Sequence, residues 1–471
     1  MTMFYRIHDT VALRSWQGTP MAYYKQTDPY AHRLSPEEFN AMVLCDGEHD
    51  LLTIPESLLS HGLIEPCDKG NHPSEWSKLH RYDNRYFPKM NLMITGKCNY
   101  NCLHCFNAAD NAPLMSEWSF TNICDLLEQA DACGIHAFTI TGGEPMIHPR
   151  FLDILKEITR HGMFVEELNT NGYFITQEIL DQMKAIGSHP VMKISFDGIG
   201  CHDWMRARKG SEERTLSAIR LCVQNGFEVK IQTQVNQKTI DSLLPTLMML
   251  EKENVSSVRL IRTTEVDRWV NNAKDATISL LDYYEKMLSL VSKYKQGNHR
   301  MSLTIWQFLS IYPSTKAYEM VPLTCAKGKY RKNAPVCKGN RGMIGITSEG
   351  EVVPCLQMSG YYKEHGISLG NVHDTSLKEL LTDSRYVETI CYTVEDLKKT
   401  NNKCASCAYY EYCCGGCRAL GLLLSGDQMD MNGSDISKCQ FFEHGWVERI
   451  RKTFADWRWL NPIPKENKTD Y

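Results

Sequence analysis

The chain has 471 residues, is 42% hydrophobic and 23% charged, and carries a formal net charge of −4. This composition is typical of a globular protein with two or three domains, and its charge excludes a general attraction to nucleic acid or anionic membranes. The first twenty residues contain no apolar stretch typical of a secretory signal, and no apolar run approaches the ~20 residues of a membrane span. We therefore expect a cytoplasmic protein without membrane or nucleic-acid partners.

The nineteen cysteines are unevenly distributed. Three lie within residues 98–105, and nine lie between Cys325 and Cys439 when Cys391 is left aside. Cytosolic thiols are kept reduced, so clustered cysteines in such a chain indicate metal binding rather than a disulfide framework.

Residues 1–66 predict a small winged-helix-like module. Short strands are expected at Val11–Arg14 and Met21–Tyr24, on either side of a Gly-Thr-Pro turn. Ser35 followed by Pro36 predicts a helix start, with Ser35 as the N-cap. A second short helix is expected over residues 55–60, followed by extended chain.

This module resembles the peptide-recognition element of enzymes that modify ribosomally made peptides. The resemblance rests on three segments: Leu34-Ser35-Pro36-Glu37, Cys45-Asp46-Gly47 and Gly62-Leu63-Ile64-Glu65. It implies that the module binds the leader of a precursor peptide, for example by β-augmentation. A structural cap and a DNA-binding winged helix are the alternatives. Residues 1–65 hold four Lys or Arg against nine Asp or Glu, which disfavours DNA.

Residues 67–88 are polar and are interpreted as a linker. Residues 89–300 alternate β-rich runs with helical patterns such as Thr121–Ala132 and Phe151–His161, which predicts βαβ units and a parallel sheet. The expected strands are Asn91–Thr95, Ala137–Ile140, Val165–Leu168, Val191–Ser195, Val229–Thr233 and Ser257–Ile261. The predicted fold class is thus α/β, a partial (β/α)6 TIM barrel with its chemistry at the C-terminal ends of the strands.

Three cysteines follow the first of these strands. Cys98, Cys102 and Cys105 can hold three corners of a [4Fe–4S] cluster and leave one iron without a protein ligand. The spacing resembles the radical S-adenosylmethionine (SAM) superfamily, in which that iron chelates SAM. A zinc site or structural thiols are the alternatives. By the same resemblance Phe106 packs near the SAM adenine, unless it is an ordinary core residue.

Further segments at strand ends resemble the SAM pocket of that superfamily. Gly142, Gly143 and Glu144 lie in Thr-Gly-Gly-Glu-Pro after the second strand, where Glu144 is expected to accept a hydrogen bond from the SAM amine. Asn169 ends the third strand. The resemblance implies that Ser195 contacts SAM, and Arg206 is a candidate partner for its carboxylate. A surface arginine and common turn pairs are the alternative interpretation.

The C-terminal cysteines have a spacing similar to the seven-cysteine SPASM extension of peptide-modifying radical SAM enzymes, placed here at residues 337–440. The resemblance implies two auxiliary [4Fe–4S] clusters and therefore three in all. One would be held by Cys404, Cys407, Cys413 and Cys439, and the other by Cys337, Cys355 and Cys417. Cys325 is the candidate eighth ligand; otherwise one iron stays open. A zinc ribbon is the alternative for this segment.

These resemblances predict a radical SAM oxidoreductase that abstracts hydrogen from a precursor peptide and forms a cross-link, with a cysteine thioether as the leading hypothesis. Carbon–carbon cross-linking, epimerisation, formylglycine formation and non-catalytic electron transfer are the alternatives. A flavodoxin or ferredoxin would supply electrons. Residues 301–336 are expected to bridge the barrel and the cysteine-rich part. Residues 441–471 are expected to form a helix, over 441–459, and a polar tail.

Overall fold

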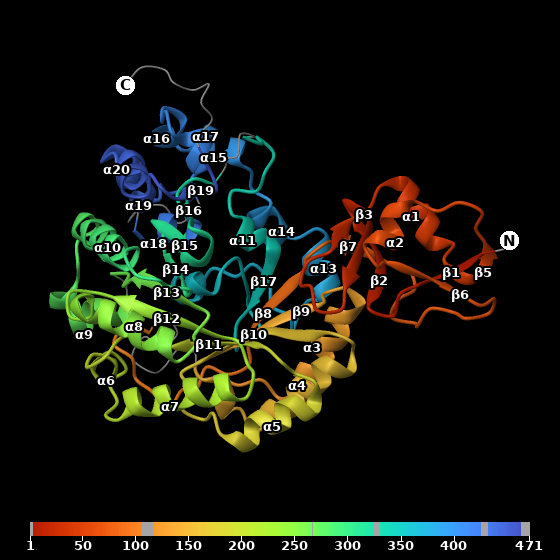
Figure 1. The fold of residues 1–471 in the computed structure, drawn as a ribbon, viewed down its shortest axis with the longest axis horizontal. Coiled ribbons are helices and arrows are strands. Elements are labelled where there is room, and N and C mark those ends of the chain that lie inside the picture. The colour runs from red at the N-terminus through yellow and green to blue at the C-terminus, as the bar shows by residue number, and fades with distance from the viewer. Residues whose placement is uncertain (1–2, 106–115, 266, 325–329, 425–431, 463–471) are drawn as a thin grey trace.

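The computed structural model describes residues 3–105, 116–265, 267–324, 330–424 and 432–462 (Figure 1). Phe106, Cys325 and the end of the tail lie outside the described residues. Within this part of the chain no helix is both long and apolar enough to cross a membrane.

A twelve-stranded sheet forms the centre of the molecule. The six strands predicted in the barrel are all present, lie side by side in chain order and pair in parallel, which confirms the α/β fold class. They are β8 (Lys89–Met93), β9 (Ala137–Thr141), β10 (Phe164–Thr170), β11 (Val191–Ser195), β12 (Val229–Val235) and β13 (Ser257–Arg262).

Amphipathic helices cover the outer face of this sheet (Figure 1). Phe138 and Ile140 of β9 share one hydrophobic core with Ile154 and Leu155 of the helix that follows. The helices between and after the strands are α3 (Phe120–Ala132), α4 (Phe151–Arg160), α5 (Gln177–Ile186), α6 (His202–Met205), α7 (Ser211–Gln224), α8 (Leu243–Lys252), α9 (Asp267–Ala273) and α10 (Leu280–Tyr294). Side chains that alternate with these core residues along each strand therefore face the interior of the barrel.

The sheet extends beyond the six predicted strands at both ends. Next to β13 come β14 (Ser302–Ile305), β15 (Leu309–Tyr312), β16 (Ala317–Met320) and β19 (Arg458–Trp459). On the other side β17 (Met343–Ile346) pairs in parallel with β8 and carries β18 (Val352–Val353). The bridging region and the cysteine-rich part thus contribute strands to the same sheet as the barrel.

Short helices make up most of the remaining C-terminal part. They are α11 (Lys338–Gly342), α12 (Ser359–Glu364), α13 (Leu377–Thr382), α14 (Arg385–Ile390), α15 (Val394–Thr400), α16 (Asn402–Ala405), α17 (Tyr410–Cys413), α18 (Arg418–Leu424), α19 (Ile436–Glu443) and α20 (Trp446–Thr453). The single helix expected over 441–459 is instead the end of α19, then α20 and β19, because Gly445 adopts a left-handed conformation that separates the two helices.

The N-terminal module consists of two small sheets, ordered β5-β1-β6 and β4-β3-β2-β7. Helix α1 begins with the predicted Ser35 cap, which forms a full capping box with Glu38. The elements are β1 (Phe4–Ile7), β2 (Val11–Gln17), β3 (Thr19–Lys25), β4 (His32–Arg33), α1 (Pro36–Val43), β5 (Asp46–Asp50), α2 (Glu56–Ser60), β6 (Ile64–Cys67) and β7 (His80–Arg85). Because β7 pairs in parallel with β2, the segment interpreted as a linker contains a strand of this module.

The module packs on the turn between α3 and β9. The Trp16 indole donates to the Cys133 carbonyl (3.0 Å), and the Tyr24 hydroxyl donates to the Gly134 carbonyl (3.3 Å). Gly134 has φ +71°, and a Cβ there would lie 2.6 Å from Trp16 and from Tyr82. The tight packing requires glycine at this position and fixes the module to the barrel.

His136 makes this interface sensitive to pH. It stacks on Tyr24, and burial, helped by the charge of Arg14, lowers the pKa of His136 to about 4. The unfolded chain binds a proton near pH 6.5, so this histidine contributes stability above that pH and loses it as the pH falls toward 4. We expect acidification from pH 7 to 5 to cost the wild type about 2 kcal/mol more than His136→Gln. Unfolding titrations at the two pH values measure the loss of stability in each protein. An equal loss in the wild type and in His136→Gln would contradict this prediction.

Candidate iron–sulfur and cofactor sites

The first three cysteines lie on the loop that follows β8, at the C-terminal end of the strand. Cys102 is buried, Cys105 is half-buried and Cys98 is exposed. The Cys98 thiol lies within electrostatic reach of Cys102 and Cys105, and the Tyr100 amide donates to the Cys98 sulfur (3.4 Å). The structure thus keeps the three predicted thiols near one another on one loop at the C-terminal end of β8.

Three arginines from distant elements contact this loop. Arg206 Nη1 lies 3.7 Å from the Cys102 sulfur, Arg208 donates to the Asn99 carbonyl (2.9 Å), and Arg268 donates to the Cys102 carbonyl (3.2 Å). These contacts fix the backbone and one sulfur of the cysteine loop to the rest of the barrel. Arg208 and Arg268 were not predicted; Arg208 follows Arg206 in an Arg-Ala-Arg segment, whereas no sequence signal marks Arg268.

Arg206 is fixed by a buried ion pair with Asp197. Its Nε lies 2.6 Å from Asp197 Oδ2, and its Nη2 donates to Oδ1 (3.1 Å). Burial by itself would raise the pKa of Asp197, but the charge of Arg206 together with the hydrogen bond and charge of His202 outweighs burial and holds that pKa well below its usual range. Arg206 therefore contacts Asp197 and Cys102, and its expected pairing with the SAM carboxylate stays a prediction.

The Gly-Gly-Glu segment after β9 packs against the start of the cysteine loop. A Cβ at Gly142 would lie 2.3 Å from the Thr95 carbonyl oxygen, and one at Gly143 would lie 2.2 Å from that of Lys97. The Gly143 and Glu144 amides donate to those same carbonyls (2.8 and 2.9 Å). The two glycines are therefore required by this backbone contact, a role that the sequence interpretation, which placed a ligand there, did not include.

Glu144 is fully buried and holds strand ends together. Its carboxylate accepts hydrogen bonds from the backbone amides of Asn171 (2.7 Å) and Met146 (3.2 Å) and from the Thr170 hydroxyl (2.9 Å). Burial raises the pKa of Glu144 to about 7, although these donors favour the ionised form. Its predicted contact with the SAM amine would add to this network, and it remains a prediction.

The contact between the two loops gives a direct test. We expect Gly143→Ala to reduce the iron bound per chain, since the added methyl collides with carbonyl oxygens of residues 96 and 97 and displaces the cysteine loop. Gly342→Ala is the matched control because no atom lies within 4 Å of its added Cβ. Equal iron content in the two purified variants would contradict the proposed role of the contact.

The barrel interior contains polar atoms that fit SAM. The side-chain carbonyls of Asn91 and Asn169 are buried without a hydrogen-bond partner. Ser195 lies at the end of β11, and its register partner is Gln232 of β12. Buried acceptors without donors are costly and are normally satisfied. The amine and hydroxyl donors of a SAM molecule match them, so the residues present fit this cofactor.

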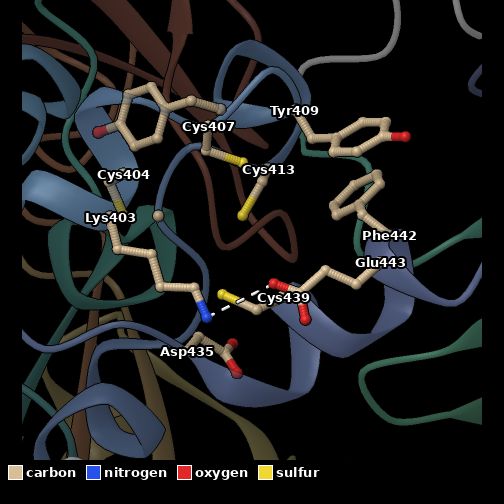
Figure 2. Close-up of a pocket in the computed structure, with 11 residues that line it drawn as sticks. Lys403, Cys404, Cys407, Tyr409, Cys413, Asp435, Cys439, Phe442 and Glu443 are labelled. Carbon is tan, nitrogen blue, oxygen red and sulfur yellow. Dashed lines mark ion pairs between the residues drawn. The ribbon is translucent and has the colours of Figure 1, made fainter.

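Four cysteines line a cavity of about 180 Å³ in the C-terminal part. They are Cys404, Cys407, Cys413 and Cys439, the four predicted to share one cluster. Figure 2 shows their sulfur atoms around this space, beside the ion pair of Lys403 and Glu443 (3.5 Å). Among the described residues no three His, Cys, Asp or Glu side chains converge tightly enough to hold a single metal ion. Four thiols around a cavity fit a cubic cluster, which takes cysteine thiolates as its ligands.

The remaining predicted ligands also lie near one another. Burial raises the pKa of Cys417 to about 12, and the charges of Cys355 and Cys337 add to this effect, which places all three in one group. Cys325 is outside the described residues. None of the eighteen described cysteines forms a disulfide.

The comparisons with known proteins agree with this geometry. Residues 92–236 match the Radical SAM superfamily, and residues 337–408 match the SPASM iron–sulfur cluster-binding domain. The chain thus carries a radical SAM domain and a SPASM domain. It is therefore an enzyme, and these two domains imply [4Fe–4S] clusters and SAM.

Its relatives act on different substrates. The chain is 23% identical to an AdoMet-dependent heme synthase of Methanosarcina barkeri (72% of this chain, 93% of the relative). It is 25% identical to the subtilosin biosynthesis protein AlbA of Bacillus subtilis (70% and 66%). Among solved structures, SuiB of Streptococcus suis bound to the precursor peptide SuiA is similar, with TM-score 0.64 and 13% identity (93% and 100%). At 13% identity, the similarity to SuiB shows a shared fold and nothing more.

Proposed function

We propose that the protein is a peptide maturase that abstracts a hydrogen atom from a ribosomally made precursor and forms a cross-link, with a cysteine thioether as the first bond type to test. The observation that carries the proposal is the N-terminal module, which packs through Trp16 and Tyr24 on a barrel that also has a SPASM domain. The similarity to AlbA and to the peptide-bound SuiB structure supports it.

In this proposal the chain holds three [4Fe–4S] clusters. Cys98, Cys102 and Cys105 hold the one that binds SAM. Cys404, Cys407, Cys413 and Cys439 hold a second, and Cys337, Cys355 and Cys417 hold a third, which Cys325 completes. When bound, SAM and its cluster supply the hydrogen-abstracting radical. The role of the chain is to hold SAM, to position the peptide and to exclude water. The residues proposed to hold SAM are Gly142, Gly143, Glu144, Asn169, Ser195, Arg206 and Phe106.

The N-terminal module is the proposed binding site for the leader. Its two sheets end in the edge strands β4, β5, β6 and β7. An extended peptide can add to such an edge through main-chain hydrogen bonds. A flavodoxin or ferredoxin is the proposed reductant, and the cytoplasm is the proposed location.

A second candidate is modification of a tetrapyrrole. The observation that favours it is the similarity to heme synthases over 72% of the chain. Carbon–carbon cross-linking and epimerisation remain alternative outcomes on a peptide. Formylglycine formation is less favoured, because the sulfatase-maturing enzymes carry an acidic residue directly after the cysteine that corresponds to Cys355, and here that residue is Leu356.

Co-expression tests the proposal. The protein is produced with each short open reading frame that neighbours its gene, and the peptides are weighed by mass spectrometry. We expect one peptide to lose two hydrogens per bond formed, with fragmentation placing the bond on a cysteine. The variant with Cys98, Cys102 and Cys105 all replaced by alanine is the control. Three results together would favour the tetrapyrrole candidate instead. They are unchanged peptide masses, no deuterium uptake from D₂O, and a change in the absorption spectrum of the protein when a porphyrin is added.

A further inference from the structure

Arg259 lies on the inner face of the barrel, in line with the proposed SAM pocket. Its neighbours along β13, Val258 and Leu260, are fully buried in the core beneath the outer helices. Arg259 therefore faces the interior. The strand register pairs Ser195 with Gln232, and Gln232 with Arg259. Since neighbouring strands are ~4.8 Å apart, the backbones of Arg259 and Ser195 are separated by about 10 Å across one continuous surface.

The Arg259 guanidinium has no hydrogen-bond acceptor within the described part of the chain. Its carbon lies 4.7 Å from the ring centre of Trp306, the residue that follows β14. Glu167 is the carboxylate whose charge acts on Arg259, but Glu167 forms an ion pair with Lys193. Among the described residues Arg259 is thus left without a carboxylate that it does not share with Lys193.

Such a charge points to a ligand. Arg259 is half-buried, and a charge that is partly removed from water is normally paired in proteins. Stacking on Trp306 engages the face of the guanidinium and leaves its in-plane N–H groups directed elsewhere. A carboxylate accepts two of these N–H groups at once, which is the geometry that arginine recognises best.

We propose that Arg259 binds a carboxylate of the substrate, namely an Asp or Glu side chain of the precursor peptide that lies within a few residues of the modified position. This inference rests on the proposed peptide function and names a chemical feature of its substrate. Trp306 holds the guanidinium in place, and the Lys193–Glu167 pair borders the subsite on the side of β10 and β11. Arg259 would thus determine which segment of the precursor enters the barrel.

A double-mutant cycle tests the inference. Each Asp and Glu of the modified precursor is replaced in turn by Asn or Gln, and kcat/KM is measured for the wild type, Arg259→Gln and Arg259→Lys. We expect one peptide substitution to lower the wild-type value about tenfold or more, chiefly through KM. The same substitution should have little effect on Arg259→Gln. Arg259→Lys should recover part of the loss, because lysine keeps the charge without the planar fork.

Two controls separate the possible causes. Arg220→Gln removes an exposed arginine that pairs with Glu253, and it should leave the peptide preference unchanged. SAM affinity, measured by calorimetry on cluster-loaded protein, should be the same within twofold in Arg259→Gln; a loss equal to that for the peptide would assign Arg259 to the SAM carboxylate and overturn the inference. Additive effects at every acidic position would also overturn it, while leaving the peptide function intact. If the wild type modifies no peptide, the function and this subsite fail together.

Discussion

Replacement of Cys98, Cys102 and Cys105 together by alanine should reduce the formation of 5′-deoxyadenosine from SAM to background. The three thiols lie on one loop, and the structure provides no other group of three cysteines at the C-terminal ends of the described barrel strands. Without them the proposed SAM-binding cluster has no protein ligands. The measurement is chromatography of the products after anaerobic reduction with dithionite, together with the iron content of the variant.

The auxiliary sites distinguish this result from general damage to the fold. The triple variant should lose about four of the irons bound by the wild type and keep those of the C-terminal part, since the two regions use different cysteines. Cys124→Ala is the control, because Cys124 lies on α3 outside all three groups. Wild-type yields of 5′-deoxyadenosine from the triple variant would contradict the assignment of this loop.

Substitution of Asp197 by alanine should lower the free energy of unfolding by about 3–5 kcal/mol. The change leaves Arg206 buried without its counter-ion. The backbone amide of Gln234 also loses its acceptor, Asp197 Oδ1 (3.0 Å). The effect on the site follows from the same contact, because Arg206 also reaches the Cys102 sulfur. Urea unfolding followed by circular dichroism measures the loss.

Asp181→Ala is the matched control for this prediction. Asp181 is exposed and lies 3.7 Å from Lys184, so its loss should change stability by less than about 1 kcal/mol. Asp197→Asn keeps the side-chain shape but not the charge, so its free energy of unfolding should lie between those of Asp181→Ala and Asp197→Ala. Equal stabilities of the Asp181 and Asp197 variants would show that the buried pair does not matter.

The parts of the fold that local patterns determine were predictable. The six β-rich runs of the barrel and the Ser35 cap are each specified by residues within one short segment. Strand β5 was not predicted, because Asp46–Asp50 is a polar sequence typical of a turn, and its extended form comes from pairing with β1. Strand β7 likewise depends on β2, and β17 depends on β8 across more than 250 residues of sequence.

The site shows the same division. Cysteine spacing indicated the three groups of thiols, and the Gly-Gly-Glu segment was interpreted as a close approach to a ligand, which stays a prediction. The sequence could not show that the collision at Gly143 is with residues 96 and 97, since that contact joins two loops. The partner of Arg206, the contact of Arg268 with the cysteine loop and the stacking of Arg259 on Trp306 also depend on tertiary structure.

The most direct test of the account is electron–nuclear double resonance on the reduced protein with SAM labelled by ¹⁵N at its amine. If Cys98, Cys102 and Cys105 hold a cluster with one iron open to SAM, the spectrum should show a nitrogen coupled to that iron, and the signal should vanish in the triple alanine variant. A spectrum that SAM does not alter, in protein with a full complement of iron, would contradict the account.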